Sequence, residues 1–358
     1  MSEKMLKITL KRYSVNKERV VEMGVKIAIV NSSSFGKYFP EHIERLKALG
    51  QVDRFELPHD MRGKALAEKL MGYSIIIASV KPFYDREFFE YKDETLLIAR
   101  HGIGYDAIDI ESATKKGTIV TIVEGIVERE AVAENAVALL LDVMRKVREA
   151  SIKVKEGKWH ERANFIGYEI KGKTAGIIGI GNIGSRVAEI LKYGFGADVI
   201  AYDPNLSKEE IIKRGARPVS LEELLRSSDI ISLNASLNER NYHMLSEREF
   251  SLMKKNVFIV NTARGELIDP DALIKALREG KVAGVGLDVV EGEPIDENHP
   301  LLKFDNVVIT PHTSAYTYEC LKGMGDKVVS DAEKVLRGEI PDGVVNKEVL
   351  EGEKWKKI

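Results

Sequence analysis

The chain has 358 residues, of which 44% are hydrophobic and 31% are charged, and its formal net charge is −2. This composition is typical of a globular protein of two domains, and so small a charge gives no general attraction for nucleic acid or membrane surfaces. No apolar run is long enough to span a bilayer, and the first residues lack the apolar stretch of a secretory signal. The single cysteine, Cys320, excludes an internal disulfide and gives no metal cluster, so no metal is expected and a reducing cytoplasm is the expected location.

Glutamine occurs once, as Gln51, whereas lysine and glutamate are abundant. Scarce glutamine together with many charged side chains indicates a thermophilic source. Residues 1–24 precede the first clear strand, and weak alternation of apolar and polar residues over 5–14 predicts an edge strand or a hairpin there.

Four apolar runs in the first third of the chain have the length and composition of buried strands. They are residues 26–31, 74–80, 95–100 and 118–123. Helical spacing over 41–49, which ends at Gly50, falls between the first two of them. Because strands that alternate with helices form parallel sheets covered on both faces, residues 25–125 are expected to form one small α/β domain.

A long helix is predicted over 128–147, and its one apolar face fits either a core helix or a dimer-forming helix. From residue 173 onward, strands are predicted near 176, 198, 229, 257, 284 and 306, with a helical pattern between each pair. Six strands with helical crossovers are typical of a dinucleotide-binding domain. The last predicted helix, over 318–338, could cross back to the first domain.

The most informative motif is G-x-G-x-x-G, which Gly179, Gly181 and Gly184 form between a buried strand and the start of a helix. Such a turn leaves backbone N–H groups at a helix N-terminus, where they hold a pyrophosphate. The next apolar run, 198–202, ends in Asp203, which is placed to accept hydrogen bonds from the adenosine ribose. A carboxylate there would repel a 2′-phosphate, so NAD is the expected cofactor rather than NADP.

Charged side chains follow three later apolar strands. Arg264 follows the run that begins at 257, Asp288 the run from 284, and His312 the run from 307. Ligands of an open α/β sheet bind beyond the carboxyl ends of its strands. We therefore expect these side chains to converge on one site, together with Glu293.

These residue types suit the reduction of a carbonyl group, which needs a proton as well as the hydride that NADH carries. Histidine donates or accepts a proton near neutral pH, and His312 is the candidate. A carboxylate bonded to the imidazole, here that of Glu293, orients the ring and favours its protonated form. An arginine side chain binds a carboxylate and polarises an adjacent carbonyl group, and this is the role expected of Arg264.

At these residues the sequence resembles the D-isomer-specific 2-hydroxyacid dehydrogenase family, over nearly all of residues 25–345. The resemblance rests on Gly104-Tyr-Asp106-Ala-Ile-Asp109, Ala131-Val-Ala-Glu134-Asn135, the glycine motif, Asn261-Thr-Ala-Arg264-Gly265, Asp288-x₄-Glu293-Pro294 and Thr310-Pro-His312. It implies an α/β fold of two doubly wound parallel-sheet lobes, with a Rossmann cofactor lobe inserted into a flavodoxin-like substrate lobe. The implied substrate-binding domain is 1–127 plus 318–358, and the implied NAD-binding domain is 128–317. The segment 128–165 would build the interface of a homodimer.

The resemblance also implies roles for individual residues. Arg264, Glu293 and His312 would be catalytic, and the backbone N–H groups of Ile103 and Gly104 would bind the substrate carboxylate together with Arg264. The residues that would bind the cofactor are Gly179, Gly181, Asn182, Ile183, Asp203, Ala235, Ser236, Asn241, Thr262, Ala263 and Asp288. The family often has His-x-Pro where this chain has Asn234-Ala-Ser236.

The expected function is that of an NAD-dependent oxidoreductase that transfers a hydride between nicotinamide and C2 of a 2-keto or D-2-hydroxy acid. Glyoxylate, hydroxypyruvate and 3-phosphoglycerate are compatible substrates. A phosphate site of Lys81, Arg100 and Arg129 would favour the last of these, although ordinary ion pairing is the preferred interpretation of the three. A contact of His101 with the substrate stays open. The alternative from another class is an NAD(H)-sensing, protein-binding regulator of the corepressor type, against which the complete catalytic set argues.

Overall fold

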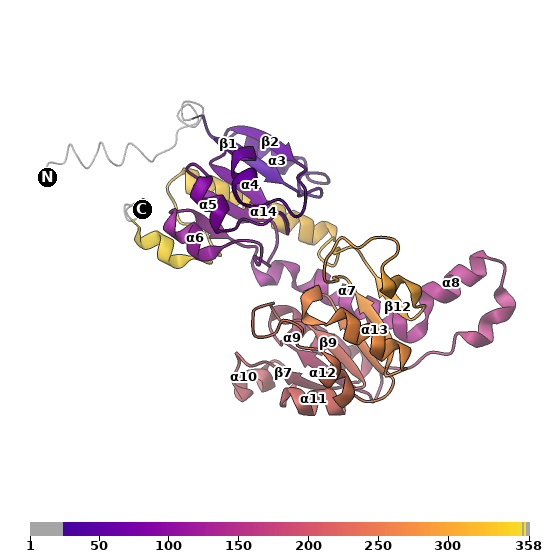
Figure 1. The fold of residues 1–358 in the computed structure, drawn as a ribbon. Helices are drawn as coiled ribbons and strands as arrows, with labels where there is room; N and C mark the ends of the chain where they lie inside the picture. The colour runs from indigo at the N-terminus through magenta and orange to yellow at the C-terminus, as the bar shows by residue number, and fades with distance from the viewer. Residues whose placement is uncertain (1–23, 353, 356–358) are drawn as a thin grey trace, which may run out of the picture. The chain divides into compact units, whose positions relative to one another are not determined.

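The computed structural model describes residues 24–352 and 354–355, and the chain divides into two compact units (Figure 1). Unit 1 contains the described residues up to Glu128 and those from Thr317 onward, and unit 2 contains Arg129–Tyr316. Unit 2 is therefore inserted into the chain of unit 1. The predicted edge strand or hairpin over 5–14 lies outside the described residues.

Unit 1 is built on a parallel sheet of five strands. Their order is β2 (Gln51–Phe55), β1 (Lys26–Val30), β3 (Ile75–Ala78), β4 (Leu97–Arg100) and β5 (Ile119–Thr121). This 2-1-3-4-5 order is that of flavodoxin-like sheets. All residues of β3, β4 and β5 are buried, whereas those of β2, at the edge, are exposed or half-buried.

Helices cover both faces of this sheet. On one face, Leu66 of α4 (Gly63–Lys69), Phe88 of α5 (Arg86–Tyr91) and Ala113 of α6 (Ile110–Lys115) share a core with alternate strand residues. Asp85 and Asp109 cap the last two helices by accepting a hydrogen bond from a backbone N–H. α14 (Tyr318–Leu336) packs against β4 and α3 (Glu41–Lys47). After α14 the chain pairs with β5 at Val344, and a short 3₁₀ turn follows at Lys347–Glu351.

Unit 2 is built on a parallel sheet of seven strands. Their order is β12 (Val307–Ile309), β11 (Val282–Leu287), β10 (Val257–Asn261), β9 (Ile230–Leu233), β6 (Thr174–Ile178), β7 (Asp198–Tyr202) and β8 (Arg217–Pro218). Counted from β6, this is the 3-2-1-4-5-6 order of a Rossmann sheet, extended by one strand. The fold is thus the expected α/β arrangement of two doubly wound sheets.

Two apolar cores lie on opposite faces of the unit 2 sheet. One joins the strands to α11 (Leu221–Ser227), α12 (Glu247–Leu252) and α13 (Pro270–Arg278), and the other joins them to α7 (Gly125–Arg145) and α9 (Asn182–Glu189). α10 (Lys208–Lys213) precedes β8, and its Ile211 belongs to the second core. A Cβ on Gly286 would lie 2.8 Å from Leu139, so glycine lets α7 approach β11 closely.

The segment that follows α7 in unit 2 extends away from the sheet. The helix ends at Arg145, where Lys146 takes a left-handed conformation, and α8 (Val147–Lys155) and a 3₁₀ turn (Trp159–Asn164) follow. Neither α8 nor this turn has a buried residue. Figure 1 shows both lying away from the sheet of unit 2. We call residues 147–168 the arm.

The strands expected from apolar runs are present in both units, but two further strands are not among them. β2 carries charged residues, and β8 has two residues, so neither has the apolar run that marks the others. The helix expected over 128–147 begins earlier, at Gly125, and ends at Arg145. Within the described part of the chain, no helix is both long and apolar enough to cross a membrane.

Candidate functional site

Three neighbouring strands of unit 2 are each followed by a residue that the sequence analysis expected at the site. Arg264 follows β10, Asp288 follows β11 and His312 follows β12, and β11 pairs in parallel with both of the others. The carboxyl ends of these strands therefore lie at one edge of the sheet, where ligands of such sheets bind.

The imidazole of His312 is hydrogen-bonded to the carboxylate of Glu293, with Nδ1 and Oε1 2.5 Å apart. The two side chains are 31% and 32% exposed, so both can be reached from solvent. His312 has a left-handed backbone, with φ of 55°, and its N–H donates to the carbonyl groups of Asp288 and Thr310. Because Nδ1 is bound to the acid, Nε2 is the nitrogen left to exchange a proton with a substrate.

The electrostatic state of Glu293 suits this pairing. Burial tends to raise the pKa of Glu293. The hydrogen bond and charge of His312, the N–H of Val290 and the charge of Arg264 outweigh burial, so the pKa of Glu293 lies below its ordinary value. A carboxylate that stays ionised forms a strong, charge-assisted hydrogen bond with the imidazole and so orients the ring.

Asn261, the last residue of β10 and fully buried, shapes the turn that carries Arg264. Its amide donates to the carbonyl of Arg264 at 2.7 Å, and its carbonyl accepts from the N–H of Ala263 at 3.0 Å. The guanidinium of Arg264 also donates to the Ala263 carbonyl, at 2.7 Å. A Cβ on Gly265 would lie 2.1 Å from the nitrogen of Glu291, so only glycine lets this turn touch the turn that carries Glu293.

Asp288 acts inside the protein rather than at its surface. It is 1% exposed, and its carboxylate accepts from the hydroxyl of Thr310 at 2.5 Å and from the N–H groups of Thr313 and Ser314 at 2.9 and 2.8 Å. Thr310 precedes His312 in the chain, and Thr313 and Ser314 follow it. The structure therefore gives Asp288 a clear part in holding the loop of His312, whereas sequence analysis expected it beside the cofactor.

The glycine turn fits a dinucleotide. Gly179 has φ of 82°, and a Cβ there would lie 2.7 Å from the nitrogen of Ala235. A Cβ on Gly184 would lie 2.0 Å from the carbonyl oxygen of Gly179, so glycine permits α9 to pack on the turn. Gly181 faces open space, with nothing within 4 Å of its Cβ position. Asn182 and Ile183 begin α9 directly after it, so their N–H groups are those a pyrophosphate would meet.

Asp203 and the loop after β9 border this turn. The carboxylate of Asp203 accepts from the N–H groups of Ile180 and Asn205, both at 3.0 Å, which holds it beside the glycine turn. Asn241 donates to the carbonyl of Ser236 at 2.8 Å. Asn234 Oδ1 is buried and has no hydrogen-bond partner among the residues that the structure describes. Thr262 and Ala263 lie between β10 and Arg264.

Unit 1 holds the remaining expected residues. Ile103 and Gly104 follow β4, and in the described ranges neither of their N–H groups donates a hydrogen bond. The buried guanidinium of Arg100 donates to the carbonyls of Gly104 and His101, and so supports this loop from inside. His101 is buried too, 3.1 Å from the hydroxyl of Ser32. Burial, with the charges of Arg100 and His42, lowers the pKa of His101 to about 3.

Some residues that organise the site were not singled out from the sequence. Asn261, Thr310 and Ser314 contribute through hydrogen bonds to the turns that carry Arg264 and His312. Asn261 and Thr310 stand inside motifs that the sequence shows, but their positions alone say nothing of these bonds. Ser314 has no sequence signal at all.

The chain is similar to known proteins of one family. Residues 137–314 match the model of the NAD-binding domain of D-isomer specific 2-hydroxyacid dehydrogenases. The glyoxylate reductase of Thermococcus litoralis is 40% identical over 88% of this chain and 96% of its own length. The D-3-phosphoglycerate dehydrogenase of Methanocaldococcus jannaschii is 38% identical over 89% of this chain and 60% of its own length.

Two solved structures are similar over most of the chain. A glyoxylate reductase from Paecilomyes thermophila has a TM-score of 0.78 and 32% identity, covering 90% of this chain and 99% of its own. A D-lactate dehydrogenase from Aquifex aeolicus, complexed with NAD and lactic acid, has a TM-score of 0.75 and 30% identity, covering 91% and 98%. The chain belongs to the D-isomer-specific 2-hydroxyacid dehydrogenase family. It is an NAD-dependent oxidoreductase that interconverts 2-keto acids and D-2-hydroxy acids.

Proposed function

We propose that this protein reduces small, unphosphorylated 2-keto acids such as glyoxylate and hydroxypyruvate, with His312 as the proton donor. The observation that carries the proposal is the 2.5 Å bond between His312 and Glu293, beside the turn of Arg264. Bound NADH supplies the hydride that goes to C2. His312 Nε2 gives a proton to the carbonyl oxygen, and the products are the D-2-hydroxy acid and NAD⁺.

The other residues bind and orient the reactants in this proposal. Arg264 holds the substrate carboxylate and polarises its carbonyl group, and Glu293 stabilises the imidazolium. The N–H groups of Ile103 and Gly104 bind the carboxylate. Gly179, Gly181, Asn182, Ile183 and Asp203 hold the phosphates and ribose of the cofactor, and the remaining proposed cofactor contacts are Ala235, Ser236, Asn241, Thr262, Ala263 and Asp288.

The preference for an unphosphorylated acid rests on the state of the candidate phosphate-binding cations. The guanidinium of Arg100 is buried and donates to backbone carbonyls of its own loop. Arg129 pairs with Glu189 at 3.3 Å and Glu130 at 3.7 Å, and the ammonium of Lys81 lies 3.5 Å from the ring centroid of Phe83. Two relatives are named glyoxylate reductase, which supports the same class of substrate for this chain. 3-Phosphohydroxypyruvate remains the second candidate, since one relative is a phosphoglycerate dehydrogenase.

Steady-state oxidation of NADH with a panel of keto acids tests the proposal. We expect kcat/KM for glyoxylate or hydroxypyruvate to exceed that for 3-phosphohydroxypyruvate by at least about tenfold, which is about 1.4 kcal/mol of transition-state binding. His312→Ala should abolish turnover and leave NADH binding intact. A wild-type protein that binds NADH and turns over none of the acids would instead support a sensor that binds a partner protein.

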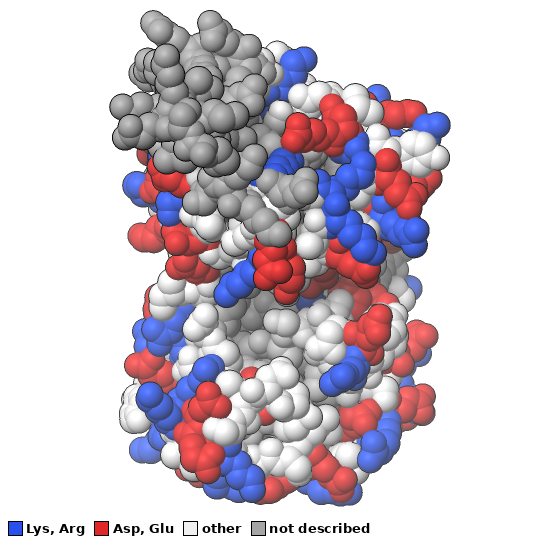
Figure 2. Space-filling view, turned by 90° about the vertical axis from the view of Figure 1, so that its left-hand side faces the viewer, with Lys and Arg blue, Asp and Glu red and all other residues white. Residues whose placement is uncertain are grey.

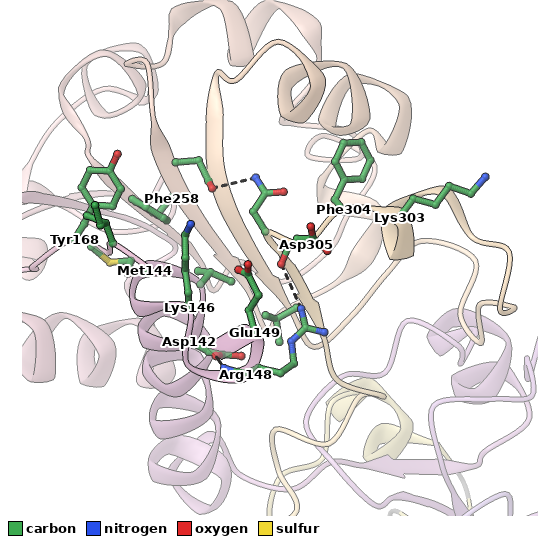
Figure 3. Close-up of a pocket in the computed structure, with 15 residues that line it drawn as sticks. Asp142, Met144, Lys146, Arg148, Glu149, Tyr168, Phe258, Lys303, Phe304 and Asp305 are labelled. Carbon is green, nitrogen blue, oxygen red and sulfur yellow. Dashed lines mark hydrogen bonds between the residues drawn. The ribbon is translucent and has the colours of Figure 1, made fainter. Parts of the chain in front are cut away.

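We also propose a homodimer that forms through the arm. Trp159 and Ile166 are 69% and 77% exposed, and Val147, Ile152, Val154 and Tyr168 of the same segment are exposed as well. Next to the arm lies a cavity of about 380 Å³ with Met144, Tyr168, Phe258 and Phe304 in its lining (Figure 3). Arg148, which also lines the cavity, donates to the carbonyl of Asp305 at 3.4 Å (Figure 3). A two-fold pairing would bury the exposed apolar side chains of each arm against the other copy.

Two broader features of the protein complete the proposal. We propose a cytoplasmic location, because a chain with one cysteine forms no internal disulfide and fits a reducing compartment. We propose a thermophilic source on the scarcity of glutamine and the abundance of charge. A thermal midpoint within the mesophilic range of about 45–65 °C would contradict the second point.

A further inference from the structure

A carboxylate beside the catalytic pair is fully engaged by side chains from a distant loop. Glu291 stands in the same turn as Glu293, after β11. Its Oε1 accepts from the hydroxyl of Tyr242 at 2.7 Å, and its Oε2 lies 2.7 Å from Nε2 of His243. The rings of Tyr242 and His243 stack with centroids 4.0 Å apart and planes at 18°, so the two donors are held as one group.

The turn that contains Glu291 also carries Glu293, whose carboxylate is bonded to His312. Glu293 and Val290 bond each other across it, with the Glu293 N–H donating to the Val290 carbonyl at 3.2 Å and the Val290 N–H donating to the Glu293 carboxylate at 3.4 Å. Gly292, between Glu291 and Glu293, has φ of 79°. A shift of Glu291 would therefore move the carboxylate that orients His312.

His243 contacts the arginine turn as well. Its N–H donates to the carbonyl of Glu266 at 2.8 Å, and Glu266 follows Arg264 by two residues. Leu245, two residues later, forms a parallel β-bridge with Ile268. The backbone of His243 is left-handed, with φ of 50°, a conformation that directs its N–H to one turn and its ring to the other. One residue thus bonds to both catalytic turns.

The loop that carries His243 is also the loop proposed to contact the nucleotide. Asn241 accepts from the N–H of Asn238 at 2.7 Å and donates to the carbonyl of Ser236 at 2.8 Å. Its own carbonyl accepts from the N–H of Met244 at 3.1 Å. These bonds connect residues 236–244 with one another. A ligand that orders the start of this loop therefore also orders its end.

We propose that Tyr242 and His243, through Glu291, transmit binding of the nucleotide at the loop after β9 to the position of Glu293 and Arg264. Tyr242, His243 and Glu291 are positioning residues in this proposal, which rests on the proposed function. Their contact makes the catalytic turns more ordered when NADH is bound than when the loop is empty. None of the three needs to touch the substrate. Tyr242 is 53% exposed, so a hydrogen bond that served stability alone would contribute little at its position.

Hydrogen exchange measures this coupling without turnover. Amide exchange of residues 288–294 would be followed with and without saturating NADH in the wild type, His243→Ala, Glu291→Ala and the double variant. We expect NADH to slow exchange of these amides in the wild type and not in the three variants. NADH itself should bind each variant with a dissociation constant within about fivefold of the wild type, the size of effect that one lost contact in a network gives.

Kinetic measurements give the second readout. Each single variant should lower kcat for the best keto acid about tenfold, and the double variant should be no worse than either single one, because the residues act as one unit. His243→Gln keeps an N–H donor near the place of Nε2 and should recover part of the lost kcat. Tyr242→Phe removes a single hydroxyl, so it provides the same comparison should the larger truncations not fold.

Glu247→Ala is the matched control, because it removes an exposed pairing with Lys275 in the same unit, at 3.1 Å, and it should behave as the wild type in both measurements. The proposal is overturned if NADH protects residues 288–294 equally in wild type and His243→Ala, or if the two single effects on kcat multiply in the double variant. A wild-type protein that reduces no keto acid would contradict the proposed function. The hydrogen-exchange comparison would still test whether NADH binding is coupled to the order of residues 288–294.

Discussion

The carboxylate of Asp288 and the hydroxyl of Thr310 lie 2.5 Å apart, although 22 residues separate them in the chain. They come from the ends of two paired strands, β11 and β12. Together with the bonds to Thr313 and Ser314, this contact encloses the loop whose centre is His312. Asn135 of α7 donates to the hydroxyl of Ser314 at 2.7 Å, so the same loop is also attached to the long helix. Rigid support of this kind places a proton donor reproducibly.

Asp288→Asn should therefore reduce catalysis by displacing His312. The amide would present a donor where a backbone N–H now finds an acceptor, and an unsatisfied buried group costs about 1–3 kcal/mol. We expect kcat to fall by at least about tenfold and the thermal midpoint to drop, with the NADH dissociation constant changing less. The exposed Asp305→Asn is the control. A large loss of NADH affinity with unchanged kcat would show that Asp288 acts on the cofactor and not through the loop of His312.

The pH dependence of reduction should reveal the charge of Glu293. The pKa of this group lies below its ordinary value in the folded protein, so the carboxylate is ionised through the neutral range and loses its charge only as the pH falls through that lowered pKa. Glu293→Gln removes the charge and keeps the shape, so kcat/KM should fall by at least about tenfold, and the loss of activity that protonation of the carboxylate causes in acid should disappear from the profile. The rate against pH, measured for both proteins at saturating NADH, gives the comparison. An unmoved profile would mean that Glu293 and His312 are not coupled in the reaction.

Cofactor choice should depend on Asp203. Its carboxylate is held beside the glycine turn by the N–H groups of Ile180 and Asn205. Asp203→Ala should weaken NADH about tenfold, the effect of losing a charge-assisted hydrogen bond to the ribose, and should narrow the gap between NADH and NADPH. The ratio of kcat/KM for the two cofactors measures this. Asp198→Ala, at the exposed start of the same strand, should leave the ratio unchanged.

Buried His101 should make the stability of unit 1 sensitive to acid. Its pKa is lowered to about 3 by burial and nearby positive charge, whereas the unfolded chain has an ordinary histidine there. As pH falls below about 6.5, the unfolded state takes up a proton that the folded state does not, and stability falls by up to about 1.4 kcal/mol per pH unit. His101→Gln should flatten the unfolding free energy between about pH 7 and pH 4. The exposed His160→Gln should keep the wild-type slope, and equal slopes for all three proteins would contradict the assignment.

The proposed dimer should depend on the apolar residues of the arm. Ile166→Lys places a charge on a side chain that is 77% exposed in the single chain, so the fold should tolerate it. If the arm pairs two copies, burying that charge would cost several kcal/mol and the protein should become a monomer. Sedimentation or light scattering at micromolar concentration measures this. Ile212→Lys, 60% exposed on α10, is the matched control, and a mass equal to one chain for the wild type would end the proposal.

Sequence pattern predicted the elements whose residues bury the most apolar surface. Every residue of β3 and β10 is buried, and both are apolar runs except for Asn261 at the end of β10. The glycine turn follows a strand and opens a helix as expected. β2 could not be found in the same way, because an edge strand exposes one side and its sequence, Gln-Val-Asp-Arg-Phe, has no apolar period. Lys146 breaks the long helix in a left-handed conformation without the glycine that usually marks such a break.

The position of each site residue after a strand could also be predicted from the sequence, but the contacts between these residues could not. Arg264, Asp288 and His312 each follow a strand, which is enough to place them at one edge of a parallel sheet. That Asp288 is turned inward to bind residues 310–314 depends on the register of β11 against β12. The pairing of His243 with Glu291 joins residues 48 positions apart through two loops, and loop conformation leaves no period in the sequence.

Insertion of unit 2 into unit 1 has a consequence for biosynthesis. The strands β1–β5 leave the ribosome early, but α14, which packs on β4, and Asn346, whose buried amide bonds the backbone at Thr118 and Val120, are made only after the whole of unit 2. At about 5–20 residues per second, the nascent N-terminal sheet waits many seconds with part of one face and one edge uncovered. Unit 2 has all of its strands within a single stretch and can fold during that delay. The half of the protein that is synthesised first is therefore the half that is completed last.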